Sequence, residues 1–328
     1  MSLSRRTLLL AAAGSALAGC RAAAKPAERV TGAVPAAPVP AVPPPSGGPA
    51  SSPTTGPPAS PTAAASSPTA GPEPVAATAV PGGPGPAPAP GAPIGRAEVL
   101  ARYRGVEPAR WGLDVSGVTS ELPPGQRATA LTFDACGGSG GSGYDAGLID
   151  LLRAHDVPAT LFLNARWIDA NPAEFESLAG DPLFEIGNHG TLHRPLSVTG
   201  RSAYGIAGTG DVGEAYDEVA GNLAKLTALL GRPPRFFRSG TAHYDDVATR
   251  IAADLGQQVA GFTVNADGGA TFTSAQVRAE LDATPPGAIV IAHLNHPAGG
   301  TAPGFAAALP SLLAAGRRFA RLSDVLPG

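Results

Sequence analysis

Segments with the patterns of strands and helices alternate along residues 95–328, and this alternation restricts the possible folds more than any other feature of the chain. Apolar, β-prone stretches that are typical of buried strands lie at 128–135, 158–165, 184–189, 235–240, 258–267 and 287–295. Stretches with apolar residues at helical spacing lie at 96–105, 145–155, 214–231, 247–256, 274–284 and 304–316. Such a series indicates a parallel α/β sheet with crossover helices, and its length favours a closed or nearly closed barrel over an open sheet.

The first twenty residues, MSLSRRTLLLAAAGSALAGC, have the features of an export signal. A basic start is followed by an apolar run and by small residues before Cys20. The pair Arg5-Arg6 resembles a twin-arginine signal, and LAGC resembles a bacterial lipobox, in which the cysteine becomes the lipidated first residue. The alternative, a short transmembrane anchor, requires a longer apolar run. We therefore predict an exported lipoprotein, attached through Cys20 to the outer face of the cell membrane, with its folded domain in the cell-wall space.

Residues 21–94 consist almost entirely of Pro, Ala, Gly, Ser and Thr. This composition has no amphipathic period and too little apolar surface to offset the entropy lost on ordering. We predict a disordered tether, partly in the polyproline II conformation, that leads from the membrane to a domain over 95–328. A passive spacer predicts the same behaviour, and a Pro-rich recognition ligand is a further alternative.

Charge and cysteine content limit the partners and the covalent bonds of the chain. The 23 Lys and Arg residues nearly balance the 26 Asp and Glu residues, for a net charge of −3, so the sequence has no electrostatic footprint for nucleic acid. The chain has two cysteines, Cys20 and Cys136. If Cys20 carries lipid, Cys136 has no partner for a disulfide, and burial alone must stabilise the domain.

Ionisable residues stand at the carboxyl ends of five of the expected strands. The set comprises Asp134, His189, Arg238, Asp267 and His293, and His193 follows His189 by four positions. In parallel barrels the chemistry gathers at this end of the strands. Each residue alone has a simpler explanation, such as a turn cap, a surface charge or a half-buried histidine. It is improbable that these separate explanations apply to all of the residues at once, at matching strand ends, so we predict one shared site.

His189 and His193 predict a metal site, since residues four apart share one face of a helix and two neutral imidazoles can hold a divalent cation. Such an ion would acidify a bound water and polarise a carbonyl. Asp134 could accept the proton of that water, and Arg238 could keep the carboxylate ionised and oriented.

His293 is suited to protonate a leaving group on the opposite side of the site. Asp267 could raise the pKa of this imidazole and fix its tautomer. Together with the metal and the base, this acid predicts hydrolysis of an amide or an ester.

Residues 127–325 resemble the polysaccharide deacetylase family, also called NodB-like or carbohydrate esterase family 4. The five stretches that carry the resemblance are LTFDACGG, HGTLH, RFFRSG, VNADGG and AIVIAHLN. The resemblance implies a distorted barrel of the (β/α)7 type, a zinc or similar divalent ion, and removal of acetyl groups from N-acetylated sugars. It implies these roles: base, Asp134; metal ligands, His189 and His193; tether of the base, Arg238; partner of the acid, Asp267; and acid, His293.

The sequence departs from the family pattern in two places. Ala135 stands where a second aspartate of the family ligates the metal, so the third ligand must come from elsewhere, or the metal is weakly held or absent. Asp134 could turn to the ion, Asp145 is a further candidate although helix capping explains it more simply, and Cys136 could bind as a thiolate or be a small buried cysteine. The stretch after Arg238 lacks the usual proline, so sugar specificity cannot be inherited from the family.

Three functions are compatible with these residues. The first is a metal-dependent deacetylase of cell-wall glycan, such as peptidoglycan or a related N-acetylglucosamine polymer, to which the anchor and tether would bring the enzyme. The second is a hydrolase of a non-sugar amide or an O-acetyl ester on the same barrel. The third is a glycan-binding protein with a decayed site, which Ala135 motivates.

Overall fold

The computed structural model describes residues 94–327. The predicted export signal over 1–20 lies outside the described residues, as does the predicted tether up to residue 93. Among the helices of the described part, none is both long enough and apolar enough to span a membrane.

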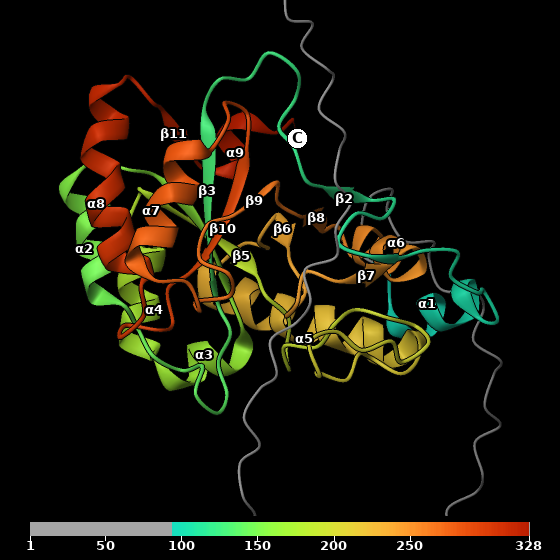
Figure 1. Cartoon of the computed structure of the whole chain (residues 1–328). Helices are drawn as coiled ribbons and strands as arrows, with labels where there is room; N and C mark the ends of the chain where they lie inside the picture. Colours follow the sequence, from blue (N-terminus) through green and yellow to red (C-terminus); the bar gives the residue numbers. More distant parts are fainter. Residues whose placement is uncertain (1–93, 328) are drawn as a thin grey trace, which may run out of the picture. The chain divides into compact units, whose positions relative to one another are not determined.

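A curled parallel sheet forms the centre of the described domain and confirms the predicted α/β class (Figure 1). The strands follow the order β2 (Val118–Thr119), β8 (Gln258–Ala260), β6 (Phe236–Phe237), β5 (Phe184–Asn188), β4 (Ala159–Leu163), β3 (Thr129–Ala135), β10 (Ile289–His293) and β9 (Val264–Asn265), while β11 (Phe319–Ala320) also pairs with β3. Every residue of β3 and of β4 is buried. Because helices cover such strands, their sequences are continuous apolar runs rather than alternating ones.

One segment of the chain joins the two sides of the sheet. The sequence predicts a single strand over 258–267, but the structure divides this stretch into β8, which pairs with β6 and β2, and β9, which pairs with β10. The chain changes partners between them: the Gly261 N–H donates to the Thr119 carbonyl at 2.8 Å, and the Thr263 N–H donates to the Ile289 carbonyl at 2.9 Å. The segment therefore lies between β6 and β10: its first half pairs with β6 and its second half pairs with β10. This continuous chain curls the sheet round on itself.

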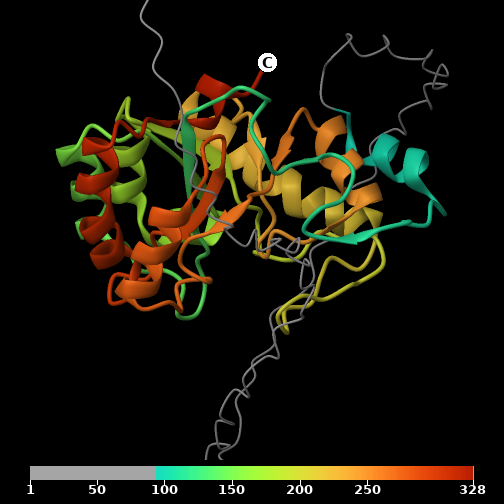
Figure 2. The same cartoon turned by 45° about the horizontal axis from the view of Figure 1, so that its top comes forward.

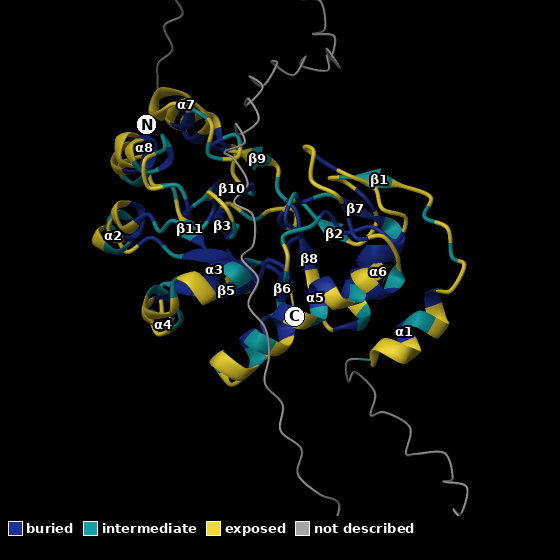
Figure 3. Ribbon diagram, turned by 90° about the horizontal axis from the view of Figure 1, so that it is seen from below, coloured by how far each residue is buried: buried dark blue, intermediate teal, exposed yellow. Residues whose placement is uncertain are grey.

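Helices surround the sheet in two groups, as two views of the domain show (Figures 1 and 2). One group contains α2 (Ala146–Ala154), α7 (Ser274–Ala283) and α8 (Thr301–Ala314), and the other contains α1 (Arg96–Tyr103), α5 (Val212–Leu230) and α6 (Asp246–Asp254). All six correspond to helices expected from apolar spacing. Their inner faces are buried and their outer faces exposed (Figure 3), as the amphipathic pattern requires.

Local sequence signals fix several helix ends. The Asp145 side chain accepts a hydrogen bond from the Leu148 N–H at 3.0 Å and so caps α2, as expected. Thr273 and Gln276 form a capping box at the start of α7. Gly231 ends α5 in the left-handed conformation, with φ of 70°.

Short elements between these units were not expected from the sequence. They are α3 (Ala165–Ala170), α4 (Pro172–Ala179), α9 (Leu322–Val325) and a separate antiparallel pair of β1 (Trp111–Gly112) with β7 (Tyr244–Asp245). Conversely, the strand expected over 235–240 is reduced to the two residues of β6. A two-residue strand or a helix of one to about two turns offers few positions at which an apolar period can repeat, so the pattern does not reveal these elements.

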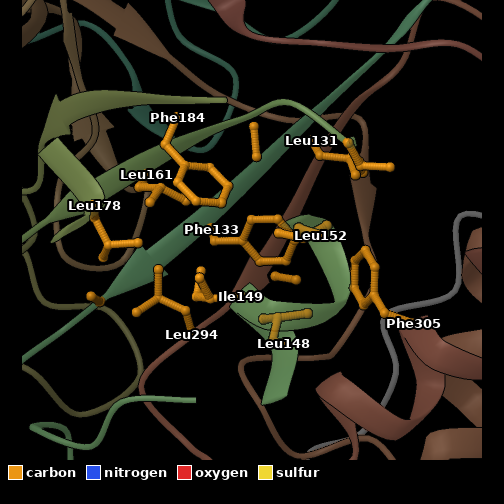
Figure 4. Close-up of a cluster of buried hydrophobic side chains, with 14 of the residues drawn as sticks. Leu131, Phe133, Leu148, Ile149, Leu152, Leu161, Leu178, Phe184, Leu294 and Phe305 are labelled. Carbon is orange, nitrogen blue, oxygen red and sulfur yellow. The ribbon is translucent and has the colours of Figure 1, made fainter. Parts of the chain in front are cut away.

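The main core lies between the sheet and the helices α2, α4 and α8 (Figure 4). Phe133 of β3 is fully buried at its centre and packs against Phe305 of α8, with ring centroids 5.2 Å apart. This packing fixes β3 against α8, and the neighbouring strand β10 ends at the same edge of the sheet as β3.

Candidate active site at the carboxyl ends of the strands

The residues predicted to form one site do meet at one end of the sheet. Asp134 and His293 are register partners on the neighbouring strands β3 and β10. His189 directly follows β5, Arg238 directly follows β6, and Asp267 lies two residues after β9. A cavity of about 470 Å³ opens there, and its lining includes Asp134, Cys136, His193 and His293.

Asp134 and Arg238 form a buried ion pair. The Arg238 Nη1–H donates to Asp134 Oδ1 at 2.8 Å, and the exposed fraction is 0% for the arginine side chain and 4% for the aspartate side chain. The other donors of Arg238 reach Thr132 Oγ1 and the carbonyls of Ala260 and Gly261. Burial alone would raise the pKa of Asp134, but the charge and hydrogen bond of Arg238, together with the charges of His189 and His293, outweigh burial and lower that pKa. The carboxylate is therefore ionised and held in one orientation.

His293 and Asp267 form the second pair. His293 Nδ1 lies 3.0 Å from Asp267 Oδ1, and the His293 backbone N–H donates to Asp267 Oδ2 at 2.7 Å. Because a carboxylate can only accept, Nδ1 carries a proton and Nε2 is left free for the cavity. Burial lowers the pKa of His293, but the hydrogen bond with Asp267 and the neighbouring Cys136 prevail and raise it well above its usual value. Asp267 is fully buried, and the same pairing lowers its pKa against the effect of burial.

The two imidazoles of HGTLH meet in a loop and not on a helix, which corrects the helical spacing from which the pair was inferred. The ring centroids of His189 and His193 are 4.9 Å apart, with the rings nearly perpendicular. Gly190, with φ of 75°, and His193, with φ of 61°, adopt left-handed conformations that turn the chain back on itself. The short loop thus achieves the proximity that a helix would have supplied.

Glu218 of α5 supports this loop, a role that was not predicted from the sequence. Its buried carboxylate accepts hydrogen bonds from the backbone N–H groups of Leu192 and Arg194, at 2.9 and 3.1 Å. Burial raises its pKa although these backbone N–H groups act in the opposite direction. A glutamate on the inner face of an amphipathic helix was the available signal, because such a carboxylate must find partners on the neighbouring segment.

The donor atoms present fit a divalent cation. His189 Nδ1 lies 2.9 Å from the Arg238 carbonyl, which can only accept, so the proton sits on Nδ1 and the lone pair on Nε2. The Nε2 atoms of both His189 and His193 are buried without a hydrogen-bond partner. Such orphaned nitrogens are rare in native interiors, and a metal ion would satisfy both at once.

The candidates for a third ligand differ in position. Asp134 Oδ2 lies 3.6 Å from His189 Nε2, although its partner oxygen is bound by Arg238. Asp145 caps α2 and is not among the described groups whose ligand atoms cluster closely. Cys136 does belong to such a group. Its Sγ and one nitrogen from each of His189 and His193 all lie within 4.8 Å of one another.

The surroundings of Cys136 alter its acidity. Burial alone would raise the pKa of the thiol, but three neighbouring imidazoles outweigh burial and lower it well below its usual value. Those imidazoles belong to His189, His193 and His293.

Comparison with known proteins bears on the family and the fold. Residues 121–260 match the model of the polysaccharide deacetylase family, described as "Polysaccharide deacetylase". No curated protein matches the chain.

Solved structures with the same fold include a carbohydrate esterase family 4 pseudoenzyme from Bacillus anthracis, at 22% identity and a TM-score of 0.55 over 65% of this chain and 70% of that one. The peptidoglycan N-acetylglucosamine deacetylase Bc1960 matches at 20% identity and a TM-score of 0.54, over 64% of this chain and 92% of its own. PdaA of Bacillus subtilis, a family 4 carbohydrate esterase, matches at 18% identity and a TM-score of 0.52, over 70% and 87%. These likenesses establish the curled parallel α/β fold.

Proposed function

With residues 121–260 matching the polysaccharide deacetylase family, we propose that the protein is a metal-dependent hydrolase that removes N-acetyl groups from an N-acetylglucosamine-containing glycan of the cell wall. One observation carries the proposal. The Asp134–Arg238 pair and the His293–Asp267 pair lie at neighbouring strand ends, beside two imidazoles whose Nε2 atoms have no partner. An ionised base, a protonated acid and a metal-binding pair are the groups that amide hydrolysis needs.

Asp134 acts as the base in this proposal. Its carboxylate is ionised because Arg238 lowers its pKa, and one oxygen is held by the guanidinium. The other oxygen, Oδ2, lies on the side of His189 and can accept the proton of an attacking water. Arg238 keeps the carboxylate from rotating away while this proton moves.

His293 acts as the acid. Asp267 binds Nδ1–H, so the proton that the leaving amine receives is held on Nε2, next to the cavity. The raised pKa of His293 keeps this proton in place until the amine forms. Asp267 itself stays ionised and orients the ring.

His189 and His193 are the residues that would hold the cation, which we propose to be zinc. When bound, the cation supplies Lewis acidity toward the amide carbonyl and toward water. The Arg238 carbonyl fixes the tautomer of His189, and the loop supported by Glu218 fixes the position of His193.

A cell-wall substrate is supported by two independent features. Bc1960 is described as a peptidoglycan N-acetylglucosamine deacetylase, and it shares the fold. The N-terminal sequence has the features of an exported lipoprotein with a long tether, which would place the domain among wall polymers.

Acetate release from N-acetylglucosamine oligomers and from peptidoglycan fragments tests the proposal. We expect release by the metal-loaded protein, loss on treatment with a chelator, recovery on addition of zinc, and no release by His189→Ala. Acetylated xylan and small cyclic amides tried beside these substrates would reveal an ester or non-sugar amide hydrolase. No release from any substrate with any divalent ion would refute the proposal.

A glycan-binding protein without activity is the second candidate, since Ala135 replaces the usual aspartate and one structure with this fold is described as a pseudoenzyme. Metal content separates the two functions. One tightly bound ion per purified chain favours the enzyme, whereas glycan binding without a bound ion favours the decayed site.

A further inference from the structure

We propose that Cys136 binds the cation as a thiolate and, with His189 and His193, completes a two-histidine, one-cysteine metal site. The inference rests on the proposed function only in that both concern the same cavity. It assigns the third ligand to a residue that lies one position beyond Ala135 in the sequence.

The course of β3 places Cys136 on the side of the cavity. Successive side chains of a strand point to opposite faces, so Asp134 and the residue two positions later share a face. Ala135 is fully buried in the hydrophobic cluster that contains Phe133, whereas Asp134 and Cys136 both line the cavity. Cys136 therefore faces the same cavity as Asp134, whereas Ala135 has no donor atom to offer a cation.

The turn after β3 holds Cys136 in this orientation. The Gly137 N–H donates to the Gly141 carbonyl at 2.9 Å, which closes the turn directly behind the cysteine. Gly137 has φ of 68°, and a Cβ on it would clash with the backbone of Trp167. A rotation of the backbone that turned Cys136 toward the core would have to break this turn and its contact with Trp167.

The three donor atoms are already close to the spacing that a cation requires. Around tetrahedral zinc, ligand nitrogen and sulfur atoms lie about 3.3–3.6 Å apart, given zinc bonds of about 2.0–2.3 Å. The observed set lies within 4.8 Å, so rotations of the side chains by about 1 Å at their tips bring it to that spacing.

The carboxylates of the site are engaged elsewhere. Asp134 is bound by Arg238, Asp267 by His293 and Thr301, and Asp145 by the first turn of α2. Cys136 forms no disulfide and is absent from the apolar clusters of the described residues, so a purely structural cysteine does not explain its position. A thiolate with two imidazoles is a donor set that favours zinc or cobalt over magnesium or manganese.

Cobalt absorbance tests the ligand directly, because a cysteine thiolate bound to Co²⁺ gives an intense near-ultraviolet charge-transfer band that nitrogen and oxygen ligands do not give. For this test the parent protein would be the full chain with Cys20→Ser, which leaves Cys136 as its only cysteine. Into this parent we would introduce Cys136→Ser, Cys136→Ala and, as a matched control, His296→Ala, which removes an imidazole of the same cavity outside the clustered group.

We expect the parent and His296→Ala to bind one Co²⁺ with the thiolate band. Cys136→Ser and Cys136→Ala should lose the band and bind zinc at least about 100-fold more weakly, while the metal-free proteins unfold at the parental temperature. Stoichiometric cobalt without the band in the parent would overturn the inference, as would parental zinc affinity in both cysteine variants or no metal binding by the parent.

Acetate release, measured on the same proteins, separates this inference from the proposed function. Release by a parent that lacks the thiolate band would overturn the role of Cys136 and leave the deacetylase proposal intact. A thiolate band in a parent that releases no acetate from any substrate would support the metal site and overturn the deacetylase proposal.

Discussion

Replacement of Asp267 by asparagine removes one charge from the site with little change in shape, and the structure gives the expected cost. Oδ1 of Asp267 accepts from His293 Nδ1 and from the Gly269 N–H, and Oδ2 accepts from the His293 N–H and the Thr301 hydroxyl. An amide NH2 in either position would face a backbone N–H donor at 2.7 or 3.1 Å. A lost hydrogen bond to a buried charge costs about 1.5–3 kcal/mol, so we expect Asp267→Asn to lower the free energy of unfolding by about that amount.

The effect on catalysis should exceed the effect on stability. His293 loses the anion that raises its pKa and the acceptor that fixes its tautomer. General acid catalysis is worth about 10²–10⁴-fold, so we expect kcat for acetate release to fall by about 10²–10³-fold with little change in KM. On the scale of 1.36 kcal/mol per tenfold, this corresponds to about 3–4 kcal/mol of transition-state stabilisation.

A double-mutant cycle with His293→Ala decides whether Asp267 acts through His293. If it does, Asp267→Asn should reduce kcat very little further in a protein that already lacks the imidazole. Thr301→Val is the matched control, since it removes one hydrogen bond from the same carboxylate but keeps the charge, and it should lower kcat far less. Losses that multiply in the double variant would refute the assignment of Asp267 to the acid.

Three further variants test other parts of the domain. Arg238→Met leaves Asp134 buried without its cation and should lower the free energy of unfolding in urea by about 3–5 kcal/mol; a change near zero would contradict the buried ion pair. Glu218→Gln weakens the acceptor of two loop N–H groups and should reduce zinc affinity by about 10–100-fold in a titration, while unchanged affinity would exclude a role in positioning the loop. Phe133→Ala opens a cavity beside Phe305 and should cost about 3–5 kcal/mol in the same urea assay, a cost that a loosely packed core would not show.

The sequence predicts the long, fully buried strands well, because their burial on both faces appears directly as apolar runs. β3 and β10 are of this kind, and the rim residues Asp134 and His293 could be placed because they end such runs. The helices with a complete apolar period were predictable for the same reason.

Features that depend on distant partners could not be predicted. The left-handed loop at His193 depends on Glu218, which is 25 positions away. The split between β8 and β9 depends on which neighbour pairs with each half, and the apolar pattern of 258–267 is the same in either case. The direction of Cys136 depends on how far β3 continues, since a strand that ended one residue earlier would alter which side chains share a face.

The segment that carries β8 and β9 has a further consequence for how this domain can diversify. Its carbonyls at Ala260 and Gly261 hold Arg238, which orients the proposed base, while Asp267 at its far end orients the proposed acid. The length of the segment thus sets the distance between the two proposed proton-transfer groups. An insertion or deletion within 261–266 would alter the gap that the scissile bond must fill, whereas changes in the loop after Asp267 could remodel the cavity wall for a different sugar and leave that gap as it is.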